Sequence, residues 1–313
     1  LDLMARPEVR IVSLTVTEKG YCHDPASGAL NLDHPDILHD LNHDTPKSAI
    51  GYLVRALQIR KAAGVPPFTI LSCDNLPGNG QLLRGLVLEM AGIIDPALAN
   101  WVAQEARFPS TMVDRITPAT TDRDIERVAE ATGRRDLAPV VHEPFSQWVV
   151  EDRFVDDARP DLGAAGVQMV SDVEVFETMK LRMLNGTHSA LAYTGYLAGH
   201  DTIAQTVAEP VLRAYVLALW DEIIPTVTAP PGVDLDDYAR SLLDRYDNPN
   251  IQHRTWQIAM DGSQKLPQRL LGPFRDGAQA GRDMTMVSLA IAAMASIVTG
   301  MIARPYRSVL ATG

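Results

Sequence analysis

The spacing of apolar and polar residues predicts a strand, a helix and a second strand in the first quarter of the chain. Residues 9–17 are β-branched and partly alternating, and residues 68–73 form the continuous apolar run of a strand buried on both faces. Between them a helix is predicted to begin at Thr45 and Pro46, an N-cap followed by proline, and to end at Gly64. This order predicts a right-handed crossover and an α/β layer.

The later part of the chain is dominated by helical periodicity. A short helix over 124–132 and a strand region over 140–150 lead to a connection rich in Pro, Gly and Asp at 156–166. Six longer helical patterns follow, at 175–195, 202–224, 235–246, 251–260, 265–271 and 283–303. The predicted fold class is therefore α/β plus all-α, with a parallel-sheet domain followed by a mostly helical domain.

Composition narrows the class of protein. With 313 residues, 46% of them hydrophobic and 21% charged, the chain resembles a soluble globular protein of two domains. A net charge of −11 without a basic cluster argues against nucleic-acid binding. The uncharged stretch 284–303 is rich in Ala, Ser and Thr, which favours a core helix over a membrane span. Two cysteines and no signal peptide predict reduced thiols in the cytoplasm.

The stretch 177–188 concentrates polar groups on one predicted helix face. On a helix of 100° per residue, Glu177, Lys180, Asn185 and His188 fall within about 140° of arc, on the same side as apolar residues. An inward lysine is expected to have a lowered pKa through desolvation, which suits a general base. The alternatives are a routine helical ion pair of Glu177 with Lys180 and a core histidine at position 188.

A polar, Gly-rich turn follows the second predicted strand. Asp74 and Asn75 stand where ligands bind in open α/β sheets, outside the carboxyl ends of the strands. The amides of Asn75 and Asn185 are candidates to polarise a carbonyl or hold an alkoxide. The alternative is an ordinary turn leading into a helix from about Gln81.

Histidine and aspartate are frequent after the first strand. The i, i+4 spacing of His39 and His43 is that of half a metal site on a helix, and His34 lies nearby. The favoured interpretation is a solvated acidic turn, because no third ligand has a recognisable spacing. No metal is therefore predicted, and a metalloprotein built on these histidines is kept as an alternative.

The motifs in combination resemble the mannitol dehydrogenase family of long-chain dehydrogenases and reductases. The resemblance covers essentially the whole chain and rests on these segments: 17–21, 74–80, 113–116, and Lys180 with Asn185 and His188. It implies a partial Rossmann-like dinucleotide-binding domain over 1–148, without the family's N-terminal Gly-rich fingerprint, and a helical substrate domain over 149–313. It also implies a metal-independent oxidoreductase that uses NAD, with NADP as an alternative.

The same resemblance implies roles for individual residues. Lys180 would be the general base, Asn75 and Asn185 the oxyanion-stabilising pair, and His188 a substrate-orienting group. Glu177 would lie near the proton exit, and Asp114 close to the substrate. The positions expected at the cofactor are Thr17, Asp74 and Asn75.

The stretch 253–269 bears on the substrate. Gln257 stands where the mannitol-specific branch has an arginine, and the stretch is more similar to the fructuronate reductases, or mannonate oxidoreductases. Arg254 or Arg269, with Lys265, would bind a sugar-acid carboxylate, unless Arg269 is only a surface charge. The small-molecule partner is therefore expected to be D-mannonate or D-fructuronate. A mannitol- or arabinitol-type polyol 2-dehydrogenase and a truncated, non-catalytic sugar-binding fragment are the alternatives.

Overall fold

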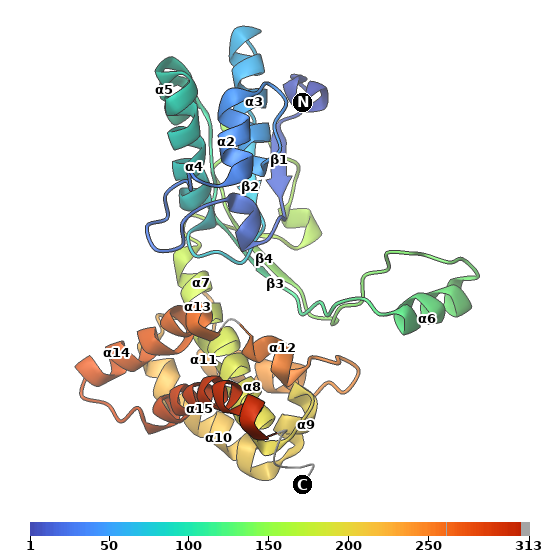
Figure 1. Cartoon of the computed structure of the whole chain (residues 1–313), viewed down its shortest axis with the longest axis vertical. Helices are drawn as coiled ribbons and strands as arrows, with labels where there is room; N and C mark the ends of the chain where they lie inside the picture. The colour runs from blue at the N-terminus through green and yellow to red at the C-terminus, as the bar shows by residue number, and fades with distance from the viewer. Residues whose placement is uncertain (261, 308–313) are drawn as a thin grey trace. The chain divides into compact units, whose positions relative to one another are not determined.

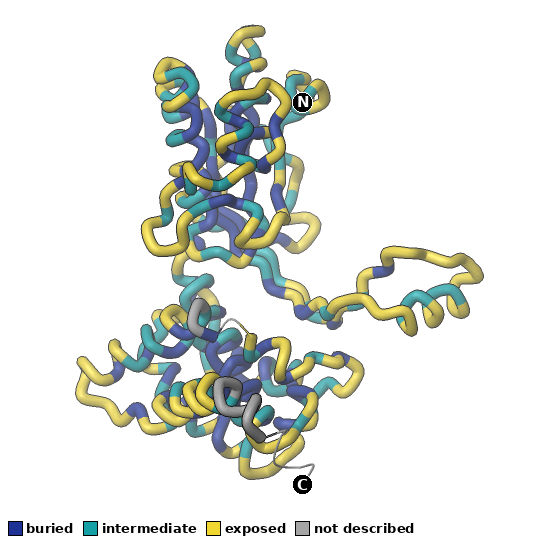
Figure 2. Tube along the Cα trace, viewed as in Figure 1, coloured by how far each residue is buried: buried dark blue, intermediate teal, exposed yellow. Residues whose placement is uncertain are grey.

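The chain forms two compact units (Figure 1). A computed structural model describes residues 1–260 and 262–307. The first unit contains Leu1–Asp114 and Ser146–Glu174, and the second contains Arg115–Phe145 and Val175–Gly313. Each unit has its own apolar core, and Figure 2 shows buried segments inside both.

A two-stranded parallel sheet is the centre of the first unit. Strands β1 (Ile11–Leu14) and β2 (Thr69–Ser72) pair in parallel, with Ile11 opposite Thr69. Helix α3 (Ala49–Ala62) forms the crossover between them. All four residues of β2 are buried, as the uniform apolar run predicted. The predicted strand–helix–strand unit is confirmed.

Helix α3 begins later than predicted. The expected start at Thr45 and Pro46 is wrong, because the N-cap is Ser48, whose Oγ accepts the Gly51 N–H at 2.9 Å. The Asp40 carboxylate accepts the preceding backbone N–H groups, from Lys47 at 2.7 Å and Ser48 at 2.8 Å. The buried Asp40 carboxylate thus holds this segment outside the helix, and local helix propensity does not predict such a contact.

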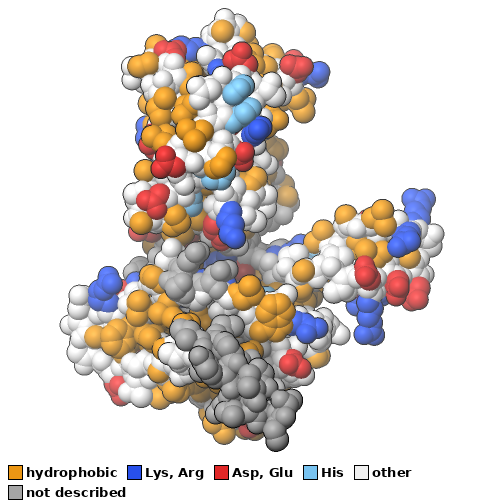
Figure 3. Space-filling view, viewed as in Figure 1, with side chains coloured by type: hydrophobic (Ala, Val, Ile, Leu, Met, Phe, Trp, Pro, Cys, Tyr) orange, Lys and Arg blue, Asp and Glu red, His pale blue; other side chains and the backbone are white. Residues whose placement is uncertain are grey.

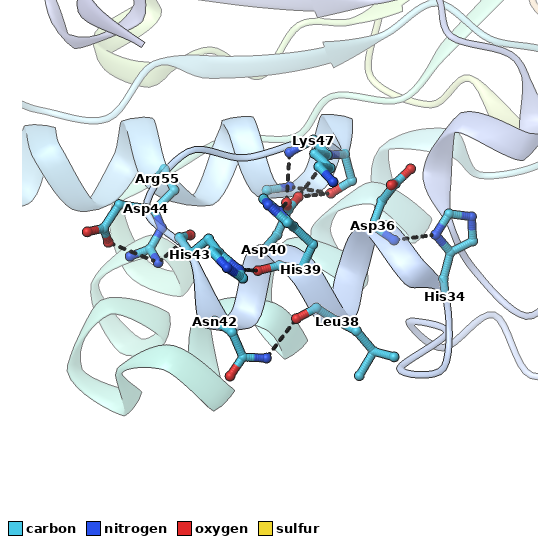
Figure 4. A network of polar contacts seen from close by, with 12 residues as sticks. His34, Asp36, Leu38, His39, Asp40, Asn42, His43, Asp44, Lys47 and Arg55 are labelled. Carbon is cyan, nitrogen blue, oxygen red and sulfur yellow. Dashed lines mark hydrogen bonds and ion pairs between the residues drawn. The ribbon is translucent and has the colours of Figure 1, made fainter.

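The expectation of a solvated acidic turn after the first strand is wrong at Asp40. This residue lies in helix α2 (Pro35–Asn42) and is fully buried. Burial alone would raise the pKa of Asp40, but hydrogen bonds from Ser48, His39 and two backbone amides hold that pKa below its ordinary value. Figure 4 shows these contacts converging on the carboxylate.

The nearby histidines are engaged in local contacts. The rings of His39 and His43 stack with centroids 4.2 Å apart, and His43 Nδ1 lies 2.9 Å from the His39 carbonyl oxygen. His34 Nδ1 accepts the Asp36 N–H and caps α2 (Figure 4). Within residues 1–260 and 262–307, no group of three His, Cys, Asp or Glu is placed to hold a metal ion.

The rest of the first unit consists of helices and a second, mixed sheet. In this sheet β3 (Thr111–Asp114) pairs antiparallel with β4 (Gln147–Glu151), which pairs in parallel with β5 (Gln168–Val170). The strand predicted over 140–150 thus begins later, at Gln147. The helices are α1 (Asp2–Ala5), α4 (Asn79–Ile94) and α5 (Pro96–Glu105), with 3-10 turns at Glu18–Tyr21, Val155–Asp157 and Gly163–Ala165.

The described part of the second unit is helical. Its elements are α6 (Asp122–Thr132), α7 (Glu174–Met179, which starts in the first unit), η4 (Lys180–Gly186), α8 (Thr187–Ala198), α9 (Ile203–Ala208), α10 (Pro210–Ile223), η5 (Ile224–Thr226), α11 (Leu235–Tyr246), α12 (Thr255–Ala259), α13 (Gly262–Leu266), η6 (Pro267–Leu271), α14 (Gly272–Gln279) and α15 (Thr285–Arg307). Elements η4 and η6 are π-helices. The helix predicted over 202–224 is divided at Pro210, which starts α10.

Helix α15 is a core helix of this unit, as predicted for the uncharged stretch. Val287, Ala290 and Ala293 are buried in the same apolar cluster as residues of α8 and α10. Leu289 and Val298 on the same helix are exposed. No helix in the described part of the chain has the length and apolar character needed to span a bilayer.

The segment Arg115–Phe145 of the second unit carries α6 and is mostly exposed. Thr121 and Asp124 form a capping box at the start of α6. Acidic and basic side chains lie side by side over α6 in Figure 3, so this helix presents mixed charge on that face.

Candidate functional site

The stretch singled out by its polar residues is a π-helix joined to α-helices at both ends. Lys180 opens η4, and His188 lies just after it, in α8. Lys180 is 6% exposed and His188 is 8% exposed, so the predicted inward orientation of both is confirmed. The wheel of 100° per residue does not hold here, because a π-helix bonds i to i+5 and turns less per residue. Such wide turns occur often at functional sites.

The two π-helices η4 and η6 approach closely at a glycine. A Cβ atom on Gly186 would lie 2.8 Å from the carbonyl oxygen of Arg269. That distance is shorter than a carbon–oxygen contact allows, and the obstacle is backbone. Gly186 therefore permits the contact that brings Arg269 beside the polar stretch.

We expect Gly186→Ala to destabilise the second unit by about 1–3 kcal/mol, because the methyl group forces the two π-helices apart. Chemical denaturation measures the change. The matched control is Gly85→Ala in α4, where the new Cβ would have no neighbour within 4 Å. That control is expected to stabilise the helix by about 0.5–1 kcal/mol. Equal stability of Gly186→Ala and the wild type would contradict the close contact.

His188 contacts two other aromatic rings. Its ring stacks on Tyr246 of α11, with centroids 5.7 Å apart and an interplanar angle of 19°. Its centroid lies 4.5 Å from that of His253, at an angle of 58°. Burial, together with the charges of His253, Arg269, Arg245 and Lys265, holds the pKa of His188 well below its ordinary value. The imidazole is therefore neutral near pH 7.

These shifts predict a loss of stability in acid. Unfolding returns each imidazole to an ordinary pKa of 6.5, whereas burial lowers the pKa of His253 to about 4 in the folded chain. The unfolded chain thus binds more protons below pH 6.5, so stability is complete above that value and falls as the pH drops toward 4. For His253 the loss is on the order of 2–3 kcal/mol. Hydrogen exchange of the α8 amides measures it, and unchanged protection across this range would contradict the prediction.

The basic residues predicted at the substrate fall into two groups. Arg269 donates to Ser189 Oγ at 3.1 Å, and Lys265 Nζ donates to the carbonyl oxygens of Ile258 and Met260 at 3.2 and 2.6 Å. Both are partly buried, and both lower the pKa of His188. Arg269 is therefore not a mere surface charge.

Arg254 and Gln257 differ from Lys265 and Arg269. Arg254 is the N-cap residue of α12 and Gln257 lies within that helix, and both are exposed. Lys265 and Arg269 are partly buried and their charges act on His188, whereas Arg254 and Gln257 are exposed.

A buried ion pair ties the segment Arg115–Phe145 to α11. Arg245 donates to both carboxylate oxygens of Glu143, Nη2 to Oε1 at 2.8 Å and Nε to Oε2 at 3.0 Å. The side chains are 6% and 3% exposed. The Arg245 guanidinium lies 4.1 Å from the Phe145 ring centroid, and Glu143 also accepts the Ile116 N–H at 2.6 Å. Because Arg245 precedes Tyr246, this pair fixes the end of α11 that contacts His188.

In the first unit, Asp74 holds the loop that follows β1. Its carboxylate accepts the N–H of Val16 at 3.0 Å, the N–H of Thr17 at 2.9 Å and the Tyr21 hydroxyl at 2.8 Å. Thr17 has φ +62°, a left-handed conformation that a threonine adopts only when its surroundings enforce it. Asn75 is exposed in the turn that follows β2. The carboxylate predicted at the cofactor is thus engaged with the protein's own backbone.

The polar turn after β2 leads into α4 at Asn79, slightly earlier than predicted. The Asn79 Nδ2 donates to the carbonyl oxygens of Asp74 and Thr111 at 3.0 and 2.9 Å, and its Oδ1 accepts the Thr111 N–H at 2.9 Å. This amide links the turn after β2 to the start of β3. Asp114, the residue expected near the substrate, is 5% exposed at the end of β3.

Comparison with known proteins identifies the family. The family model of the mannitol dehydrogenase Rossmann domain matches residues 1–164, and that of the mannitol dehydrogenase C-terminal domain matches residues 172–303. The chain belongs to the mannitol dehydrogenase family. The predicted family and the predicted fold class, a Rossmann-type domain followed by a mostly helical one, are both confirmed.

Individual members of the mannitol dehydrogenase family are similar over most of this chain. A D-mannonate oxidoreductase of Escherichia coli (strain K12) is 53% identical over 294 residues, which are 93% of this chain and 60% of that protein. Mannitol dehydrogenase DSF1 of Saccharomyces cerevisiae is 45% identical over 87% of this chain and 54% of its own length. Mannitol 2-dehydrogenase of Pseudomonas fluorescens, solved as a ternary complex with NAD and D-mannitol, superposes with a TM-score of 0.85 at 41% identity, over 94% of this chain and 60% of that one. The chain thus spans 54–60% of the length of these three relatives.

Proposed function

We propose that the full-length protein carrying this chain is an NAD-dependent oxidoreductase that interconverts D-mannonate and D-fructuronate without a metal ion. The observation that supports this most is the buried Lys180 and neutral His188 around a π-helix, with the positive charges of Lys265 and Arg269 acting on His188. The relative named a D-mannonate oxidoreductase supports the substrate class.

The first unit fits a dinucleotide. Ligands of open α/β sheets bind outside the carboxyl ends of the strands, and there Asp74 holds the backbone of Thr17 while Asn75 is exposed. The relative solved with NAD belongs to the same family. Bound there, NAD would supply the hydride chemistry: the alcohol carbon would give up a hydride in oxidation and receive it back in reduction.

The residues of the chain would handle the proton. Lys180 takes the proton from the substrate hydroxyl in oxidation and gives it back in reduction, and Glu177, one turn earlier, relays it to solvent. The amides of Asn75 and Asn185 stabilise the partial negative charge on the alkoxide oxygen. Within the described residues, the buried Asn185 Oδ1 lacks a protein donor, and a substrate hydroxyl would supply one.

A carboxylate on the substrate suits the charges around His188. Arg269 donates to the Ser189 hydroxyl oxygen and Lys265 donates to two backbone carbonyl oxygens, and both side chains place positive charge where it acts on His188. We assign them to the substrate carboxylate, with Arg254 as a more exposed contributor, and Asp114 to a substrate hydroxyl. Reduction of fructose is the competing activity, because the yeast mannitol dehydrogenase is 45% identical.

The test is oxidation of NADH by the full-length protein, with fructuronate, tagaturonate and fructose assayed in parallel and EDTA present. We expect turnover with a sugar acid that EDTA does not reduce. Loss of turnover in EDTA would show that a metal is required. If no ketose is reduced, the proposed activity is wrong and a non-catalytic, sugar-binding role is the alternative.

A further inference from the structure

His253 contacts His188 from a segment whose backbone is fixed on both sides. The His253 N–H donates to the Ile251 carbonyl at 2.8 Å, and the His253 carbonyl accepts the Ile203 N–H at 3.0 Å. The next residue, Arg254, forms a β-bridge with Thr202. The ring at position 253 is therefore presented from an ordered backbone, although it lies in no helix or strand.

Packing determines how the His253 ring sits. Its Nδ1 is buried, and in the described part of the chain no group forms a hydrogen bond with that nitrogen. The His253 ring contacts the ring of His188, with the two centroids 4.5 Å apart. The position of each imidazole therefore depends on the other.

Tyr246 supports the same ring from another element. The tyrosine is 2% exposed, and its hydroxyl donates to the Leu184 carbonyl oxygen at 2.8 Å. Leu184 lies in the π-helix, directly before Asn185. Tyr246 thus ties α11 to the π-helix and stacks on His188, so His253 and Tyr246 together limit the rotation of the imidazole.

We propose that His253 is a positioning residue, which holds the His188 ring in the orientation that the substrate requires. This inference rests on the proposed function, since it gives His188 a substrate to orient. A neutral imidazole has one N–H donor and one lone pair, so a rotated ring exchanges a donor for an acceptor. Misplacement of an orienting group by about 1 Å costs up to a hundredfold in rate.

The experiment compares His253→Ala, His253→Phe and the neighbouring exposed control Gln252→Ala in the full-length protein. Proton NMR of the His188 ring reports its stacking on Tyr246, and steady-state kinetics report kcat and its pH profile. In His253→Ala we expect altered His188 ring shifts and a kcat lower by about tenfold to a hundredfold. Water entering the space left by the ring should move the acidic limb of the profile to higher pH.

His253→Phe keeps a flat ring without nitrogen, so it should restore the ring shifts and return kcat to within about threefold of the wild type. Gln252→Ala should change neither. The proposal would be overturned if His253→Ala left both the His188 ring shifts and the acidic limb of the pH profile unaltered. It would also be overturned if His253→Phe failed to restore the ring shifts and kcat. The NMR readout does not depend on turnover, so a wild type that reduces no ketose would refute the proposed function without deciding the ring contact.

Discussion

Replacing Lys180 by Ala is expected to lower kcat for ketose reduction by about a thousandfold, because general acid–base catalysis contributes about 10²–10⁴. Lys180 is buried and begins the π-helix that leads to Asn185 and His188. The KM for the ketose should change much less than kcat, since the lost proton transfer acts in the transition state. Initial rates of NADH oxidation by the full-length protein measure both constants.

Two controls separate a lost acid–base group from a damaged fold. Lys47→Ala removes an exposed lysine side chain. The contact of Lys47 with Asp40 is made by its backbone N–H, so the variant should turn over normally. A small primary amine added to Lys180→Ala should restore part of the rate, since it replaces the missing ammonium group. Normal turnover by Lys180→Ala would show that another group moves the proton.

Breaking the Glu143–Arg245 pair is expected to give the largest loss of stability. Removal of one partner from a buried ion pair costs about 3–5 kcal/mol, because the remaining charge is left without compensation. Either Glu143→Ala or Arg245→Ala should therefore destabilise the second unit by about that amount. The destabilisation should also disturb the packing of His188, because Tyr246, on which His188 stacks, directly follows Arg245 on α11. Urea denaturation measures the free energy of unfolding.

The matched control lies on the same helix. Arg240 pairs with Asp237 one turn away, and both side chains are 70% exposed. Arg240→Ala should leave the free energy of unfolding nearly unchanged, because solvent screens such a pair. The double variant of Glu143 and Arg245 should lose less than the sum of the single variants. Strict additivity would show that the two side chains do not stabilise each other.

Elements that depend on local pattern were predictable from the sequence. The apolar run before Cys73 becomes β2, and the periodic stretch 235–246 becomes α11 with the same ends. Burial of Lys180 and His188 also followed from their spacing with apolar neighbours. In each case the residues that specify the structure lie close together in the sequence.

Features that depend on distant contacts were not predictable. The late start of α3 follows from buried Asp40, and the π-helix at Lys180 packs against a second π-helix more than eighty residues later. No local pattern in the sequence assigns a role to His253, Tyr246 or Glu143. Their contacts with α8 and α11 span tens of residues, and no periodicity encodes them.

The identity of the substrate is tested most directly by the ratio of kcat/KM for fructuronate to that for fructose, measured with the full-length protein and NADH. The positive charges of Lys265 and Arg269, which act on His188, predict a ratio well above one. Arg269→Ala should lower kcat/KM for fructuronate by at least about tenfold and leave that for fructose nearly unchanged, because a charged hydrogen bond is worth about 1.5–3 kcal/mol. A wild-type ratio below one, or equal losses on both substrates, would contradict the account.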